Sequence, residues 1–330
     1  MSKYVPYTQV RFEGTPEEIN VQWVEARKSG IGGSDVAAIM GLNKYSSPLE
    51  IWLTKTGKQE SPDLSGNQAV EWGNILEDVI AEKFKTEHAD DYDVYRKNAM
   101  LISKVRPWAF ANLDRVVIDR KTKKKGVLEI KTVGMYRASD WEDGVPAYYL
   151  TQVTHYLSIT GYDFAIVAVL VGGQDYREYY IARDEADIKA VNEYVDTFWH
   201  DFVETDTPPA LIGNSSEADA LLSLHSVPDS TYESALDADI DLERLQEIKA
   251  DIKRLEAEKT KIENNIKALI GDAKGIETES SRITWSRSFT SMFEKKRFLT
   301  DHPELTEAFE AYTTTKPRNG GLRISARKDI

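Results

Sequence analysis

Two carboxylates and a lysine lie close together in the sequence, in two segments rich in strand-forming residues. Asp114 belongs to the first segment, residues 108–119, and Glu129 and Lys131 belong to the second, residues 126–132. An antiparallel hairpin centred on the lysine-rich turn between them would place Asp114 opposite Glu129, within about 5 Å. Glu129 and Lys131 are two residues apart and share one face of their strand. The spacing therefore predicts two carboxylates and one ammonium group on a single face.

This arrangement predicts metal-dependent phosphate chemistry. Two carboxylates at such a distance repel each other unless a divalent cation lies between them. Such a cation polarises a phosphate and lowers the pKa of a water molecule, while Lys131 would orient that water or stabilise the developing charge. A solvated hairpin face would explain the same three residues, so both interpretations stay open on this pattern alone.

Two helical segments add polar residues where apolar ones are expected. In the helix predicted over residues 71–88, Glu77 borders the apolar stripe, where a solvated glutamate is not expected. In the helix predicted over residues 148–160, Gln152 and Tyr156 form a polar edge beside the apolar side. These residues favour a functional site over a solvated face.

The composition limits which metals such a site could hold. The 330 residues include no cysteine and five histidines, which excludes zinc–thiolate sites and iron–sulfur clusters. A carboxylate site for a hard cation, Mg²⁺ or Mn²⁺, is therefore expected. The net charge of −13 argues mildly against nucleic acid as a partner, although phosphate contact needs only a local basic surface. No apolar run is long enough to span a bilayer, so we expect a cytoplasmic protein without a membrane partner.

The chain is expected to fold as an α/β (α+β) core followed by an appendage. Residues 1–205 predict a mixed central sheet flanked by helices, since residues 164–171 form the unbroken apolar run of a central strand. Proline-rich and serine-rich punctuation predicts a linker over residues 206–235. Residues 236–330 predict a heptad helix, which either packs on its own domain or joins a subunit or partner, plus a small α/β segment. The strands expected in that segment are residues 282–286 and 322–325.

A glycine-rich turn over residues 30–35 precedes a short predicted helix. Backbone amides at a helix N-terminus bind anions. Gly33 lies in this turn, Ser34 adds a hydroxyl group, and Arg27 or Lys28 could add positive charge. An ordinary turn between two helices has the same sequence features.

Taken in order, several of these segments resemble the YqaJ-like viral recombinases, in the lambda-exonuclease branch of the PD-(D/E)xK nuclease superfamily. The resemblance covers about residues 20–205. It rests on the glycine-rich turn, Ser46–Pro48, Trp72–Glu77, Asp114, Glu129–Lys131 and Gln152–Tyr156. Leu113 stands where the superfamily name places a proline, which is often missing in this superfamily.

The resemblance implies a restriction-endonuclease-like fold and a metal-dependent exonuclease. Such an enzyme would digest linear double-stranded DNA from 5′ to 3′ with Mg²⁺ or Mn²⁺, generating single strands for recombination. The implied metal and catalytic residues are Asp114, Glu129, Glu77 and the backbone carbonyl of Ile130 as metal ligands, Lys131 as the catalytic lysine, and Gln152 as a support of the site. The implied pocket for a terminal 5′-phosphate comprises Arg27, Gly33 and Ser34.

The resemblance also implies partners and an assembly. These are double-stranded DNA ends, a single-strand annealing protein, and a closed homotrimer of a phage or prophage protein in a bacterial host. Two alternatives are a structure-specific endonuclease of the same superfamily and a non-catalytic module that binds DNA ends or loads a recombinase. The presence of Asp114, Glu129 and Lys131 argues against the second alternative.

Overall fold

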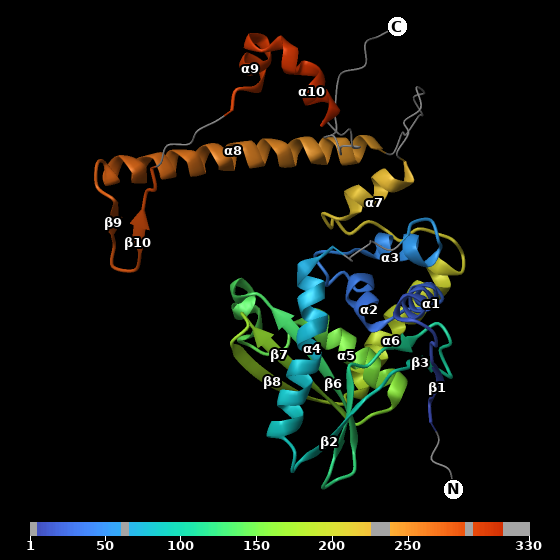
Figure 1. The fold of residues 1–330 in the computed structure, drawn as a ribbon. Helices are drawn as coiled ribbons and strands as arrows, with labels where there is room; N and C mark the ends of the chain where they lie inside the picture. The colour runs from blue at the N-terminus through green and yellow to red at the C-terminus, as the bar shows by residue number, and fades with distance from the viewer. Residues whose placement is uncertain (1–4, 61–65, 226–237, 288–292, 313–330) are drawn as a thin grey trace. The chain divides into compact units, whose positions relative to one another are not determined.

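A computed structural model describes residues 5–60, 66–225, 238–287 and 293–312 (Figure 1). The chain divides into two compact units near residue 226. In the described part of the chain, no helix combines the length and the apolar character needed to cross a membrane.

A five-stranded mixed sheet forms the centre of the first unit, in the order β2-β5-β6-β7-β8. β6 and β7 are parallel, and the other neighbours are antiparallel. The strands are β2 (Tyr92–Arg96), β5 (Arg115–Asp119), β6 (Lys125–Val133), β7 (Phe164–Val171) and β8 (Asp175–Ala182). β7 is buried along almost its whole length, as a central strand covered on both faces should be. The mixed sheet flanked by helices that the sequence predicts is confirmed.

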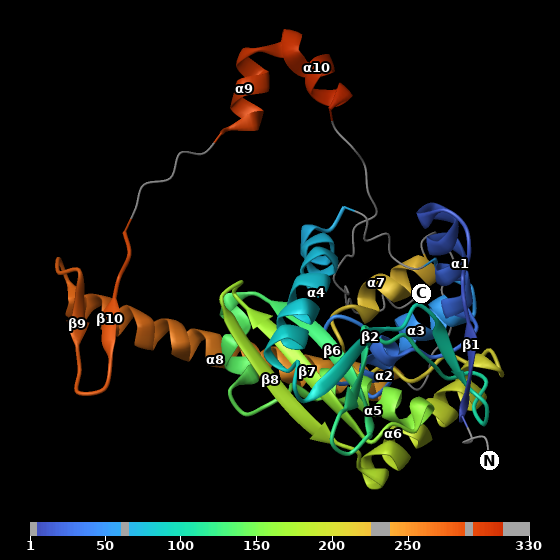
Figure 2. The same cartoon turned by 60° about the horizontal axis from the view of Figure 1, so that its bottom comes forward.

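Helices cover the two faces of this sheet, as Figure 2 shows. On one face α4 (Gln68–Glu87) packs against β6 and β7. On the other face α5 (Ala147–Thr160) packs against the same two strands, and α6 (Glu185–Thr197) packs against α5. The sheet thus separates two hydrophobic clusters, one under α4 and one under α5. A 3₁₀ helix (Met135–Trp141) precedes α5, and a π-helical segment (Phe198–Val203) follows α6.

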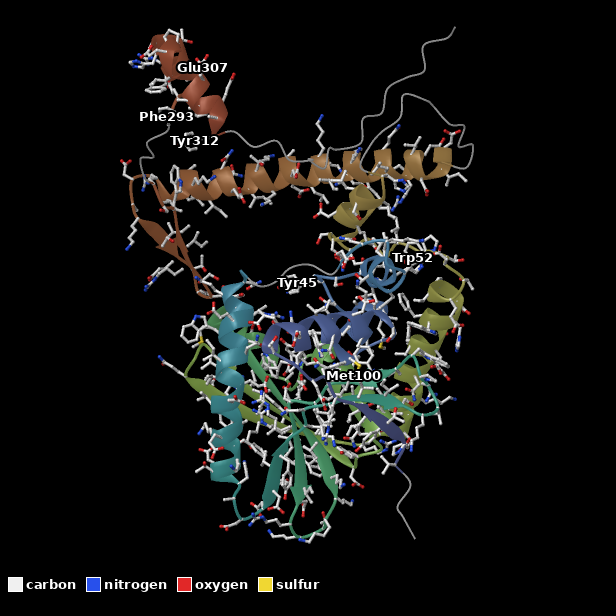
Figure 3. The ribbon with its side chains drawn as sticks, turned by 45° about the vertical axis from the view of Figure 1, so that its right-hand side comes forward. Tyr45, Trp52, Met100, Phe293, Glu307 and Tyr312 are labelled. Carbon is white, nitrogen blue, oxygen red and sulfur yellow. The ribbon has the colours of Figure 1, made fainter. Side chains whose placement is uncertain are left out.

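A second group of elements completes the first unit. It comprises β1 (Tyr7–Val10), α1 (Pro16–Lys28), α2 (Gly33–Ile39), α3 (Pro48–Lys55), β3 (Met100–Ser103) and β4 (Phe110–Ala111). β1, β3 and β4 form a small antiparallel sheet, and α2, β3 and β4 pack against α5. Trp52 and Met100 lie among the packed side chains (Figure 3), and the Trp52 indole donates to the backbone carbonyl of Phe202 at 3.0 Å.

The single strand predicted over residues 108–119 is wrong. The chain forms β4 with β3, leaves that sheet, and enters the central sheet as β5 at Arg115. Leu113 and Asp114 lie between the two strands. The strand-forming composition is continuous, but the pairing partners change, and composition does not encode a change of partner.

The described part of the linker expected over residues 206–235, residues 206–225, contains folded structure. α7 (Glu217–Leu224) packs against α3 within the first unit. The buried carboxylate of Glu217 accepts the backbone N–H groups of Ile212, Gly213 and Asn214, at 3.0, 2.9 and 3.1 Å. The prolines and serines of residues 208–216 therefore lie in a loop that is held to the first unit by hydrogen bonds.

The second unit is built on the long helix α8 (Ala238–Ile270). The helix ends at Gly271, as predicted, where φ is +54°. The remaining elements are β9 (Gly275–Glu277), β10 (Arg282–Thr284), α9 (Lys295–Asp301), a 3₁₀ turn (Pro303–Leu305) and α10 (Thr306–Ala311). β9 and β10 pair antiparallel. The strand expected over residues 322–325 lies outside the described residues.

Candidate active site

The hairpin of β5 and β6 has the predicted register. Arg115 pairs with Leu128, so one step further along both strands Asp114 lies opposite Glu129. The Ile130 N–H donates to Asp114 Oδ2 at 2.8 Å and ties this residue to β6. The Ile130 side chain packs in the cluster under α4, so its neighbours Glu129 and Lys131 face α5.

Glu129 is almost fully buried and its two oxygens differ. Oε1 accepts Gln152 Nε2 from α5 at 2.6 Å and also pairs with Lys131 Nζ. Oε2 is buried without a hydrogen-bond partner among the described residues. A buried carboxylate oxygen with no donor is costly, and a cation is the kind of ligand that such an oxygen could bind.

The electrostatics of this face is that of crowded, buried carboxylates. Burial raises the pKa of Asp114 to about 8, and the charge of Glu129 adds to the effect. Burial also raises the pKa of Glu129, although Lys131 opposes the shift. Burial disfavours the charged form of Lys131, yet Glu129 and Asp114 together hold its pKa above the usual range. A divalent cation would relieve this repulsion.

Helix α5 fixes the orientation of the pair. Gln152 Nε2 donates to Tyr156 Oη at 2.9 Å as well as to Glu129. The Lys131 ammonium lies over the Tyr149 ring, 5.1 Å from its centroid. The predicted polar edge of this helix, Gln152 and Tyr156, therefore meets the strand that carries Glu129. Tyr149 was not predicted to contact Lys131, although it lies one turn before Gln152.

Glu77 reaches the same region from α4. Its Oε1 accepts Arg115 NH1 at 2.7 Å, and its charge acts on both Asp114 and Glu129. Among the described residues, no group of three acidic or histidine side chains is arranged to hold a metal ion. The metal role of Glu77 stays a prediction, and so does that of the Ile130 carbonyl. Sequence reasoning missed Arg115, whose signal is a charge at the start of an apolar strand.

The glycine-rich turn packs against this centre. A Cβ on Gly33 would lie 2.4 Å from Tyr156 Cε1 and 2.9 Å from Gln152 Cγ, so only glycine allows α2 to approach α5 so closely. Ser34 is exposed, and its hydroxyl accepts Arg27 NH2 at 2.8 Å. The three residues predicted to bind a phosphate thus lie together, near the residues that hold Glu129.

A buried ion pair that the sequence did not reveal supports this turn. Lys55 Nζ, from α3, lies 2.8 Å from Asp35 Oδ2 and donates to the Arg27 carbonyl at 2.7 Å. Asp35 also accepts the Gly32 N–H at 3.0 Å. Burial opposes ionisation of Asp35, but Lys55 and Arg27 hold its pKa below the usual value. Twenty residues separate the partners, and no local pattern predicts their contact.

His155 serves the structure rather than a metal. It is almost fully buried, and Nε2 lies 3.3 Å from the Ile31 carbonyl and 3.2 Å from that of Phe110. One nitrogen therefore holds the glycine-rich turn to β4, while Nδ1 is buried without a partner among the described residues. Burial lowers the pKa of His155 to about 4.

This pKa predicts a loss of stability in acid. The unfolded chain takes up a proton near the ordinary histidine pKa, and the folded chain only near 4, so protonation favours unfolding between these values. The contribution should be complete above about pH 6.5 and should fall by roughly 2 kcal/mol on acidification to about pH 5. Urea unfolding at the two pH values should show a smaller drop for His155→Gln. An equal drop in both proteins would contradict the assignment.

The donors on the α5 face fit a hard divalent cation. Two carboxylates with one unpartnered, buried oxygen are the ligand type that Mg²⁺ and Mn²⁺ prefer. Lys131 and Gln152 hold the other Glu129 oxygen, so the unpartnered one stays available. The arrangement can bind a cation and a phosphate side by side.

Comparison with known proteins gives matches over most of the chain. Residues 22–163 match the YqaJ-like viral recombinase domain. The uncharacterized protein YqaJ of Bacillus subtilis (strain 168) is 32% identical over 298 residues, 88% of this chain and 91% of that protein. Among solved structures, an alkaline exonuclease (LHK-Exo) from Laribacter hongkongensis has a TM-score of 0.46 at 19% identity, and the match covers 56% of this chain and 93% of the exonuclease. The complex of LHK-Exo with dAMP has a TM-score of 0.45 at 20% identity, with the same coverage.

Proposed function

The chain belongs to the YqaJ-like viral recombinase family, and from this premise we propose that it is a metal-dependent deoxyribonuclease. The reaction is exonucleolytic hydrolysis of linear double-stranded DNA, from 5′ to 3′, with Mg²⁺ or Mn²⁺. The observation that carries the proposal is the buried Glu129, with one oxygen unpartnered, beside Asp114 and Lys131. A buried carboxylate oxygen without a donor costs stability, and together with the neighbouring carboxylate and lysine it supports a role in chemistry.

The residues divide the work of hydrolysis. Asp114 and Glu129 would hold the cation, with the Ile130 carbonyl and Glu77 as further ligands. A bound cation supplies positive charge to the scissile phosphate and acidifies a nearby water molecule. Lys131 adds a fixed positive charge where negative charge develops in the transition state. Gln152 keeps Glu129 in one orientation, and Tyr156 keeps Gln152 in place.

The glycine-rich turn supplies the preference for a DNA end. Arg27 and Ser34 offer a charge and a hydroxyl group, and the backbone at Gly33 lies between them and Gln152. A terminal 5′-phosphate bound there would place the first phosphodiester bonds near the cation. This polarity suits an enzyme that makes single strands for recombination. A closed homotrimer and a single-strand annealing protein as partner complete the proposal.

A time course with purified protein and Mg²⁺ tests the function. The substrates are linear duplex, nicked circle and closed circle, and we expect loss of the linear duplex alone. Cutting of the closed circle would indicate the endonuclease, and binding of ends without cutting would indicate the non-catalytic module.

A second comparison in the same experiment tests recognition of the terminal 5′-phosphate. Duplex with a 5′-phosphate should be degraded faster than duplex with a 5′-hydroxyl, and Ser34→Ala should reduce that preference. Lys28→Gln is the matched control, because Lys28 pairs with Glu25 and Glu60 instead of Ser34. Equal rates for the two substrates would contradict the proposed phosphate pocket, but would not contradict the proposed metal site.

A further inference from the structure

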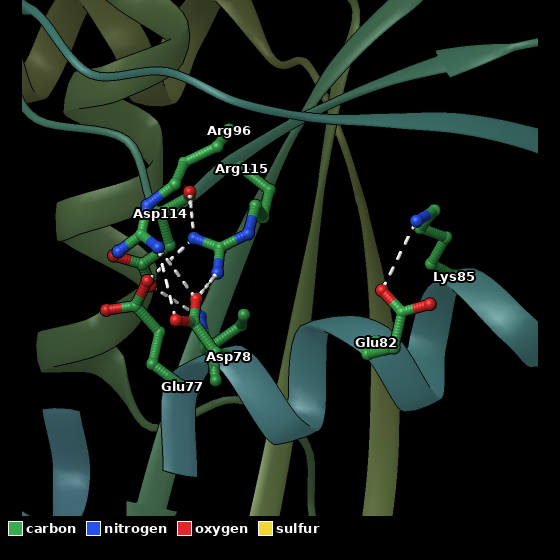
Figure 4. A network of polar contacts seen from close by, with 8 residues as sticks. Glu77, Asp78, Glu82, Lys85, Arg96, Asp114 and Arg115 are labelled. Carbon is green, nitrogen blue, oxygen red and sulfur yellow. Dashed lines mark hydrogen bonds and ion pairs between the residues drawn. The ribbon is translucent and has the colours of Figure 1, made fainter. Parts of the chain in front are cut away.

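Arg115 is a buried arginine that joins α4 to the strand start carrying Asp114 (Figure 4). Its side chain is 7% exposed. NH1 donates to Glu77 Oε1 at 2.7 Å and to the Asp114 carbonyl at 2.5 Å, and NH2 pairs with Asp78. A buried guanidinium needs a compensating negative charge, and here two carboxylates supply it.

The two carboxylates are not equivalent. Asp78 is 60% exposed, and Arg96 NH1 binds both of its oxygens, at 3.0 and 3.1 Å. Glu77 is only 26% exposed, and in the described part of the chain its ion pair is with Arg115. Asp78 is shared between Arg96 and Arg115, so Glu77 is the carboxylate that pairs with Arg115 alone among the described residues.

Glu77 acts on the candidate metal centre. Burial is the main cause of the raised pKa of Asp114 and of Glu129, and the charge of Glu77 raises both further. Three carboxylates therefore repel one another across the start of β5. The fixed cation that reduces this repulsion on the α4 side is Arg115.

We propose that Arg115 is a positioning residue that competes with a divalent cation for Glu77. The inference rests on the proposed metal-dependent function. Without a cation, Arg115 binds Glu77 and keeps it beside Asp114. A cation that takes Glu77 as a ligand must displace it from Arg115, so the arginine lowers the cation affinity of the site.

The contacts of Arg115 make such an exchange feasible. A guanidinium has five N–H donors, and Arg115 uses them on the two carboxylates and on the Asp114 carbonyl. When Glu77 leaves, Asp78 and that carbonyl remain, so no charge is buried without a partner. The clamp on Asp114 persists throughout, which keeps the first ligand in place while the other changes partner.

Mn²⁺ binding to the DNA-free, full-length protein tests the competition. Electron paramagnetic resonance measures the free Mn²⁺ and hence the affinity, independently of cleavage. Arg115→Met removes the charge and keeps an unbranched apolar stem, and should bind Mn²⁺ about tenfold more tightly. Arg96→Met is the matched control, because it removes a cation from Asp78 without touching Glu77, and should change the affinity less than about twofold.

A double-variant cycle tests whether Glu77 is the group for which Arg115 and the cation compete. Glu77→Gln should weaken Mn²⁺ binding by a larger factor in the Arg115→Met background than in the wild type, since Glu77 is unopposed there. Equal factors in both backgrounds, or unchanged or weaker binding by Arg115→Met, would overturn the competition. A wild-type protein that binds no Mn²⁺ would instead remove the proposed function itself.

A second readout needs no substitution of Arg115, and covers the case in which Arg115→Met does not fold. In the wild-type protein, Mg²⁺ should perturb the side-chain NMR signals of Arg115, because one of its hydrogen-bond acceptors leaves. The perturbation should be absent in Glu77→Gln. If these signals do not change under conditions where Mg²⁺ binds, Arg115 remains hydrogen-bonded to Glu77, and the proposal is contradicted.

Discussion

Glu129→Gln, Asp114→Asn and Lys131→Met should each lower the rate of DNA cleavage by a factor of about 100 or more. The first two remove the negative charge that we propose holds the cation, with little change in shape. The third removes the positive charge that we propose acts on the phosphate and leaves Glu129 Oε1 with Gln152 alone. Single-turnover cleavage at saturating Mg²⁺ measures the effect on the chemical step.

The stability of the same variants makes this prediction specific to function. Burial raises the pKa of Glu129, so its ionised form costs stability at neutral pH. Glu129→Gln should therefore lose little thermal stability without metal, although it is inactive, because Asp114 still compensates the charge of Lys131. A substitution that abolishes activity without lowering stability identifies a residue with a role in chemistry rather than in folding.

Lys125→Met is the control for the loss of a lysine on the same strand. Lys125 begins β6 and is exposed, and its replacement should change cleavage by less than about twofold. Near wild-type cleavage by any of the three site variants would remove that residue from the centre.

The centre on the α5 face could be predicted because its geometry is local. The turn after Asp119 fixes the register of β5 and β6, and alternation along β6 then places Glu129 and Lys131 on one side. Gln152 was predicted from the polar edge of its helix, and that edge meets Glu129. In each case the signal and its consequence lie within one element or one hairpin.

The contacts of Glu77 and Lys55 could not be predicted in this way. The partner of Glu77 depends on how α4 is rotated on the sheet. In the structure Glu77 pairs with Arg115 instead of joining a cluster of carboxylates. Lys55 meets Asp35 only because α2 and α3 pack together. The seven residues of α2 show no charge pattern that predicts a partner on another helix.

The buried pair of Asp35 and Lys55 carries the second large effect, on stability. Asp35→Asn should lower the free energy of unfolding by about 3–5 kcal/mol, because Lys55 then lies buried near the Arg27 guanidinium without a carboxylate. Lys55→Met should cost less, since Asp35 keeps Arg27 and the Gly32 N–H as partners. Urea unfolding of the two single variants measures the difference.

The order of these effects separates a buried ion pair from a surface one. In the double variant the lysine charge is gone, so it should regain part of the stability that Asp35→Asn loses. Lys58→Met is the matched control, because Lys58 pairs with Asp206 at 2.8 Å on the surface, and it should change stability by less than about 1 kcal/mol. If Asp35→Asn behaves like this control, water reaches the pair and the turn at Gly33 is not held by it. If Asp35→Asn is strongly destabilised and the double variant partly restored, the packing of α2 on α5 depends on one compensated charge, and so does the position of Arg27 and Ser34 beside the candidate metal centre.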